Sequence, residues 1–86
     1  MNDVATAVCK IVRKFVKIPD SISDKELCEG CITEYGFKSI QMMEIVSDIK
    51  IKFGVAVSTR SLATKLLGEL ITDIDVHRNK DSFLNG

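Results

Sequence analysis

One uninterrupted amphipathic run, SIQMMEIVSDIKIKF at 39–53, constrains the fold of this chain more than any other stretch. Successive residues of a helix lie about 100° apart around its axis, so the run divides into faces. One face is a core stripe made of Met42, Ile45, Val46, Ile49 and Phe53. Glycines flank the run at Gly36 and Gly54, where a turn and a C-terminal cap are needed. We therefore predict a helix from Ser39 to about Phe53.

The same run carries a second apolar stripe, more than a quarter turn from the first. It consists of Ile40, Met43, Ser47 and Ile51, and polar residues fill the remaining surface at Gln41, Glu44, Asp48 and Lys52. Two interpretations are open. A neighbouring helix covers the second stripe, or the stripe is an exposed docking surface in which methionine provides an adaptable contact.

Ser39 stands where the Gly36 turn becomes the helix. A serine at this position commonly caps one of the backbone N–H groups that lack a helical partner. The same position also exposes a hydroxyl beside the positive end of the helix dipole, which attracts phosphate. Sequence position leaves both uses of Ser39 open.

Three further helices are predicted. The first spans about Asp3 to Lys17, is capped by Asn2 or Asp3, and is stopped by Pro19. A short one from Thr59 or Arg60 to Thr64 is capped by Ser58, and the last spans roughly Leu66 to Val76. Their apolar positions are Val4, Val8, Ile11, Phe15 and Ile18, then Leu62, then Leu66, Leu67, Leu70, Ile71 and Ile74. Gly68 weakens the last helix by about 1 kcal/mol relative to alanine, which suggests that another backbone passes close to it.

The remaining segments are connections and a tail. Residues 18–38 form a long connection anchored by Ile22, Leu27 and Ile32, and Ser23-x-x-Glu26 has the form of a capping box for a short helical turn from Asp24 to about Glu29. The sequence VAV at 55–57 is an extended apolar link. We expect an all-α bundle of three main helices plus one short helix, with one domain at 1–76 and a flexible tail at 77–86.

Length and charge restrict the function classes. A chain of 86 residues supports one domain, and no segment approaches the ~20 apolar residues that span a bilayer. The 12 basic and 12 acidic side chains cancel, which argues against a general nucleic-acid binder. The N-terminus lacks the apolar core of a signal peptide, so we expect a cytoplasmic protein without a membrane partner.

Cysteine usage leaves three interpretations open. Cys28-Glu29-Gly30-Cys31 has the spacing of half a zinc site or of a redox pair. Zinc needs two further ligands, for which only Cys9 and His77 are available, and a redox motif of this type follows a strand that is not predicted here. We expect ordinary reduced thiols and no metal. His77 has no catalytic partner nearby in the sequence, and the chain is not expected to be an enzyme.

The segment YGFKSIQMMEIVSDIKIKFGV resembles the central region of acyl carrier proteins. The matching positions are Gly36, Ser39, Ile40, Glu44, Phe53, Gly54 and Val55, whereas Lys38 occupies the place of the family's usual Asp. LLGELITDI also resembles the last helix of that family, so the likeness covers nearly all of the predicted folded part. The resemblance implies an acyl-carrier-like bundle in which Ser39 bears 4'-phosphopantetheine through a phosphodiester.

The resemblance also implies partners. A phosphopantetheinyl transferase would attach the group from coenzyme A, and acyl-loading, ketosynthase or other acyl-processing enzymes of polyketide or fatty-acid-type biosynthesis would dock on the carrier. Docking would use Ile40, Met43, Ser47 and Ile51, rimmed by Lys38, Glu44 and Asp48. We expect a freestanding monomer of polyketide or specialised-pathway type.

Three alternatives stay open. The cargo could be an aminoacyl or peptidyl group. The chain could be a carrier-like interaction module that is never modified, for which Lys38 is the best argument. It could also be a small helical adaptor that binds a partner helix through the second stripe.

Overall fold

The computed structural model describes residues 3–85, and it describes the side chains of residues 3–78. Within this part the chain forms five α-helices, one 3-10 helix and no strand, which confirms the all-α prediction. The elements are α1 (Asp3–Phe15), α2 (Asp24–Cys28), η1 (Ile32–Tyr35), α3 (Ser39–Phe53), α4 (Thr59–Thr64) and α5 (Leu67–Asn85).

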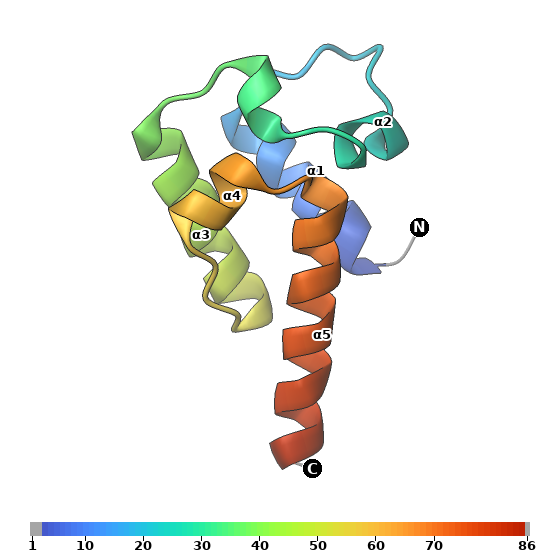
Figure 1. Cartoon of the computed structure of the whole chain (residues 1–86), viewed down its shortest axis with the longest axis vertical. Coiled ribbons are helices and arrows are strands. Elements are labelled where there is room, and N and C mark those ends of the chain that lie inside the picture. The colour runs from blue at the N-terminus through green and yellow to red at the C-terminus, as the bar shows by residue number, and fades with distance from the viewer. Residues whose placement is uncertain (1–2, 86) are drawn as a thin grey trace.

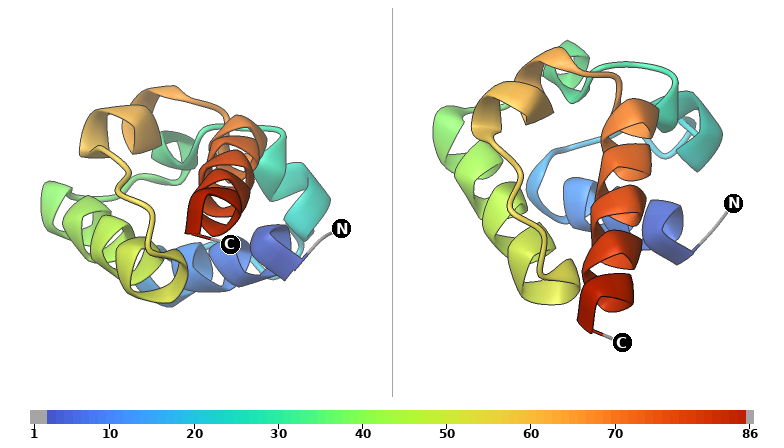
Figure 2. Two further views of the ribbon diagram at one scale, coloured as in Figure 1. Left: turned by 90° about the horizontal axis from the view of Figure 1, so that it is seen from below. Right: turned by 60° about the horizontal axis from the view of Figure 1, so that its bottom comes forward.

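The three long helices, α1, α3 and α5, surround the core (Figure 1). Helix α1 packs against both α3 and α5, while α4 joins α3 to α5 along another side (Figure 2). Helix α2 and η1 lie at one end of the molecule. Helix α2 contacts α1 and α5, and η1 contacts α4. At the opposite end, the C-terminal part of α5 extends beyond the other helices (Figure 1). None of the described helices has both the length and the apolar character that crossing a membrane requires.

Helix α1 forms because its apolar residues recur at spacings of three and four, which places them on one side of a helix. Val4, Val8 and Ile11 are buried as predicted, and Val12 and Val16 are fully buried as well. The helix ends at Phe15, not at the predicted Lys17, with a last backbone bond from Val16 to Val12. The residue before a proline disfavours the α region, so Ile18 cannot continue the helix into Pro19. The backbone hydrogen bonds of a further helical turn therefore do not form.

The connection between α1 and α3 is anchored by the predicted residues. Ser23 caps α2 by accepting from the Glu26 N–H at 3.2 Å, and the Glu26 carboxylate accepts from the Ser23 N–H at 3.4 Å. This is the predicted capping box. Leu27 and Ile32 are fully buried, and Ile22 is half-buried against the core. The 3-10 helix was not predicted.

The last two helices follow the predicted pattern with shifted boundaries. Ser58 caps α4, as expected, by accepting from the Ser61 N–H at 3.0 Å. Helix α5 begins at Leu67, so Leu66 lies outside it and is 42% exposed, contrary to its predicted place in the apolar face. The predicted end at Val76 is also wrong, because the helix continues to Asn85. The flexibility predicted for 77–86 stays a prediction.

Gly68 explains how α2 and α5 approach each other. A Cβ atom at this position would lie 3.0 Å from the Cys28 carbonyl oxygen, and the Leu67 N–H donates to the Gly30 carbonyl at 3.0 Å. The predicted passage of a second backbone beside Gly68 is therefore confirmed. The glycine costs helix propensity but allows the two main chains to touch.

Candidate functional site

Ser39 is the first residue of α3 and is exposed. The residue that caps the helix is Lys38, whose backbone is extended (φ −94°, ψ 161°) and whose carbonyl accepts the first helical bonds from Gln41 and Met42. The Ser39 hydroxyl makes no hydrogen bond with the described residues. The prediction that Ser39 caps the helix is therefore wrong, because the helix starts one position too early for it.

Gln41 makes the side-chain hydrogen bonds at the start of α3. Its side-chain oxygen accepts from the Lys38 N–H at 2.6 Å, and its side-chain nitrogen donates to the Phe15 carbonyl at 2.8 Å. Gln41 thus satisfies one unpaired group at the start of α3 and one at the end of α1. The sequence carried a signal for this role, since glutamine three residues after the cap is half of a capping box. The prediction that Gln41 belongs to the polar, solvent-facing surface is therefore incomplete, because its side chain is half-buried and hydrogen-bonded.

The turn before Ser39 is held in place from both sides. Gly36 has φ 67° and ψ 91°, a conformation that favours glycine, and a Cβ atom there would meet nothing within 4 Å. Tyr35 and Phe37 are half-buried against the core on either side of it. Two aromatic anchors and one permissive glycine therefore fix the direction in which the chain enters α3.

The two faces of α3 differ as predicted. Ile45 and Ile49 are fully buried, and Met42, Val46 and Phe53 pack partly buried against them. On the outer face, Ile40 is 65% exposed, Met43 62% and Ile51 80%. Ser47, Glu44 and Lys38 are exposed as well. No described element covers the outer stripe, so the interpretation that a neighbouring helix buries it is wrong. The outer stripe extends for about 16 Å along the helix, starting beside Ser39.

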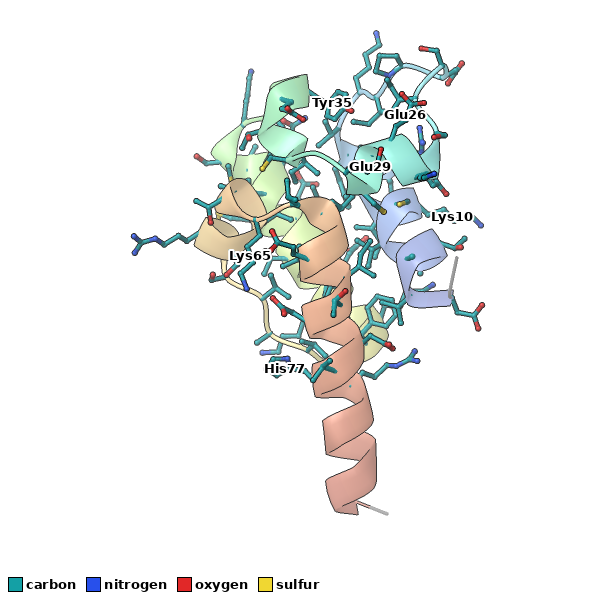
Figure 3. All side chains as sticks on the ribbon, turned by 45° about the vertical axis from the view of Figure 1, so that its right-hand side comes forward. Lys10, Glu26, Glu29, Tyr35, Lys65 and His77 are labelled. Atoms are coloured by element: carbon teal, nitrogen blue, oxygen red, sulfur yellow. The ribbon has the colours of Figure 1, made fainter. Side chains whose placement is uncertain are left out.

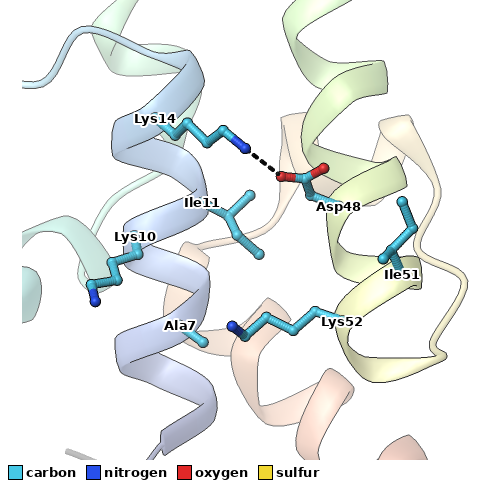
Figure 4. A pocket seen from close by; sticks show the side chains of 7 residues that line it. All are labelled: Ala7, Lys10, Ile11, Lys14, Asp48, Ile51 and Lys52. Atoms are coloured by element: carbon cyan, nitrogen blue, oxygen red, sulfur yellow. Dashed lines mark hydrogen bonds and ion pairs between the residues drawn. The ribbon is translucent and has the colours of Figure 1, made fainter.

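Asp48 lies apart from the other predicted docking residues. It faces α1, where its carboxylate pairs with the Lys14 ammonium at 3.4 Å (Figure 4). This pair spans a shallow groove of about 410 Å³ between α1 and α3, lined by Ala7, Lys10, Ile11, Lys14, Asp48, Ile51 and Lys52. An exposed pair of this kind contributes at most about 1 kcal/mol. Ile51 belongs to both surfaces, because it ends the outer stripe and borders the groove.

A second hollow lies between α5 and the segment that joins α3 to α4. It has a volume of about 300 Å³ and is bordered by the extended link at 55–57 and by Lys65, Asp73 and His77. Figure 3 shows Lys65 and His77 on the side of α5 that faces this link. Lys65 pairs with Asp73, and His77 contacts the Asp73 carbonyl at 2.7 Å. The Lys65 pair links α5 to the residue that follows α4, whereas the His77 contact lies within α5, and His77 is exposed.

The cysteines do not pair as their spacing in the sequence suggests. Cys28 faces Cys9 of α1 with 3.8 Å between the sulfur atoms, while the Cys31 thiol lies 3.8 Å from the Thr64 carbonyl. All three are free thiols. Within the described residues, no three His, Cys, Asp or Glu side chains gather as metal ligands would.

The features of Ser39 fit the attachment of a phosphodiester-linked group. Its hydroxyl is exposed and unengaged by the described residues, it lies at a helix start where backbone N–H groups lack helical partners, and an exposed ammonium neighbours it at Lys38. The unpaired N–H groups and the Lys38 ammonium both carry positive charge that attracts a phosphate group. The chain matches no family model, and neither curated proteins nor solved structures gave a significant match to it.

Proposed function

We propose that this protein is an acyl carrier that bears 4'-phosphopantetheine on Ser39. One observation carries the proposal: Ser39 is exposed at the start of α3, yet Lys38 and Gln41 do the capping. A serine with no hydrogen bond to the described residues, next to a turn that is held by half-buried aromatic residues, is what a modification site requires. The matching residues around it, from Gly36 to Val55, support the same function by resemblance.

The chain's own residues would present the hydroxyl and not activate it. A serine hydroxyl is a weak nucleophile without a base, and no histidine or carboxylate is bonded to Ser39, so a transferase must provide the base and the magnesium. The helix dipole of α3 and the Lys38 ammonium would stabilise the negative charge of the phosphodiester. The attached group supplies a thiol that holds an acyl chain as a thioester.

The outer stripe of α3 would bind the partner enzymes. Its apolar residues Ile40, Met43 and Ile51 begin beside Ser39, so a partner seated on them also reaches the attached chain. Glu44 adds a charged rim. Small, partly charged surfaces give weak binding with fast association, which suits a carrier that visits several enzymes. The groove-facing Asp48 would contribute less, because it is already paired with Lys14.

The test is the intact mass of the protein before and after incubation with coenzyme A, magnesium and a broad-specificity phosphopantetheinyl transferase. We expect a gain of one phosphopantetheine in the wild type and none in Ser39→Ala. Ser21→Ala is the matched control, since it removes an exposed hydroxyl outside α3 and its outer stripe, and it should be loaded like the wild type.

Stability measurements separate this proposal from a capping role. Because Ser39 does not cap α3, Ser39→Ala should change the free energy of unfolding by less than about 0.5 kcal/mol. A loss of about 1 kcal/mol or more would restore the capping interpretation. Absence of loading in both the wild type and a Lys38→Asp variant would overturn the proposal and favour an interaction module that is never modified.

A further inference from the structure

Two thiols from different helices meet inside the molecule. Cys9 lies on α1 and is 1% exposed, and Cys28 is the last residue of α2 and is half-buried. Their sulfur atoms are 3.8 Å apart, and both are free thiols. A disulfide bond is about 2.05 Å long, so the two sulfurs need to approach by less than about 2 Å.

The surroundings keep this pair distinct from the Cys-x-x-Cys sequence motif. Cys31 is turned toward α4, where its thiol contacts the Thr64 carbonyl. Cys28 is therefore placed to react with Cys9, which is 19 residues away in the sequence, and not with its near neighbour. Cys28 also has the larger exposure of the pair, so a reagent in solution reaches it first.

We propose that Cys9 and Cys28 form a redox-active dithiol, which closes to a disulfide between α1 and α2 in the presence of a low-molecular-weight disulfide such as glutathione disulfide. The inference rests on the packing of α1 against α2 and is independent of the carrier function.

The reaction proceeds by two thiol–disulfide exchanges. The Cys28 thiolate attacks one sulfur of glutathione disulfide, which forms a mixed disulfide and releases one glutathione. The Cys9 thiolate then attacks the Cys28 sulfur, which forms the protein disulfide and releases the second glutathione. The two protein thiols are oxidised, one glutathione disulfide is reduced, and the two thiol protons end on the two glutathione molecules.

Burial of Cys9 determines the rate of closure. Removal from water, followed by the nearby Cys28, raises the pKa of the Cys9 thiol to about 12. The second exchange needs the Cys9 thiolate, so this step should be slow at neutral pH. The mixed disulfide on Cys28 should therefore accumulate before the protein disulfide appears.

The disulfide would strengthen the junction of three helices. Cys28 already touches α5, because its carbonyl oxygen lies against Gly68. A bond to Cys9 would add a covalent link to α1 and restrict the unfolded chain over the loop between them. Cys9 and Cys28 are 19 residues apart in a chain of 86 residues. For a loop and a domain of these sizes, the midpoint of thermal unfolding should rise by roughly 10 °C or more.

The experiment treats the full chain with glutathione disulfide, in both the wild type and Ser39→Ala, so that a thiol attached at Ser39 does not contribute. Intact mass should show a transient glutathione adduct, followed by loss of two hydrogen atoms relative to the reduced protein. Digestion without reductant should then yield a peptide pair that links Cys9 to Cys28, and the reductant should reverse the rise in the unfolding midpoint.

Two variants make the result decisive. Cys31→Ser should close the same disulfide as the wild type, because Cys31 lies toward α4. Cys28→Ser should form none, and Cys9 should stay unmodified in the folded protein because it is buried. A Cys28–Cys31 peptide pair in the wild type, or no intramolecular disulfide at all, would overturn the proposal.

Discussion

At the scale of single residues, Gln41 and Ser39 at the start of α3 differ in their hydrogen bonding. Gln41 accepts from the Lys38 N–H and donates to the Phe15 carbonyl at the end of α1, while the hydroxyl of Ser39 makes no hydrogen bond with the described residues. A polar group that is exposed, fixed on a helix end and unused by the described structure is available for chemistry. The proposed modification follows from this division of tasks.

A second prediction at this scale concerns Cys9 and alkaline pH. Its pKa is raised by burial from 9.0 to about 12, with further contributions from Cys28 and Asp24 and an opposing one from Arg13. Above its ordinary pKa the unfolded chain releases the proton while the folded chain keeps it, so the free energy of unfolding falls as pH rises. The expected slope is up to about 1.4 kcal/mol per pH unit above pH 9.

Denaturant unfolding under reducing conditions checks this expectation. Between about pH 8 and about pH 10, the wild type should lose on the order of 1 kcal/mol more stability than Cys9→Ala, whose residue 9 does not titrate. The comparison removes contributions from lysine and tyrosine, which both proteins share. Equal pH dependence in the two proteins would show that Cys9 is not shielded from water.

At the scale of elements, α3 has two apolar faces because its apolar residues outnumber those that one core stripe can hold. The inner face joins the core through Ile45 and Ile49, and the outer face stays open to solvent. Exposed Ile and Met side chains in one row on a small protein mark an interaction surface. The described core does not use the second apolar face, and the docking proposed above gives it a role.

Met43 tests this surface. Met43→Glu adds a charge to the proposed apolar contact. We expect acyl transfer to a partner enzyme to fall by about fivefold, which corresponds to about 1 kcal/mol of binding free energy. Loading at Ser39 should be unchanged. Leu66→Glu is the control, because Leu66 is an exposed apolar residue outside α3. Transfer that is equal in Met43→Glu and the wild type would remove the outer stripe from the interface.

At the scale of the whole molecule, the core ends before the last helix does. All residues of the described buried cluster lie between Val4 and Ile74, and the C-terminal part of α5 continues past the other helices (Figure 1). Helices in proteins are stabilised mainly by the packing of an apolar face, and among the described side chains the last buried one on α5 is Ile74. Stability should therefore depend on the chain only as far as Ile74.

Truncation tests where the folded unit ends. For a chain that stops after Arg78, we expect a free energy of unfolding within about 0.5 kcal/mol of that of the full chain, because no residue of the described buried cluster is removed. A chain that stops after Asp73 also loses Ile74, which is fully buried, and should be destabilised by about 2 kcal/mol or more. A large loss in the longer truncation would show that the end of α5 packs against the body.

Most of the helical architecture could be predicted because its signals are local. Periodic apolar residues, Pro19, the Ser23 and Ser58 caps and Gly54 each act within a turn or two of the chain, and α2, α3 and α4 begin at or beside their predicted first residues. The end predicted at Val76 is wrong because no stop signal stands there in the sequence. Ahead of Pro19, α1 ends at Phe15 and not at Lys17, a shift within the usual spread of helix boundaries.

The sequence by itself determined an all-helical chain, a core stripe and an outer stripe on α3, and a serine at the start of that helix, because helical periodicity and turn residues are properties of neighbouring positions. Only the tertiary structure decided that the outer stripe is uncovered, that Gln41 replaces Ser39 as the capping side chain, and that Cys28 meets Cys9 and not Cys31. Each of these depends on which helix faces which across the core, and a contact between residues distant in the chain leaves no periodic trace in one sequence.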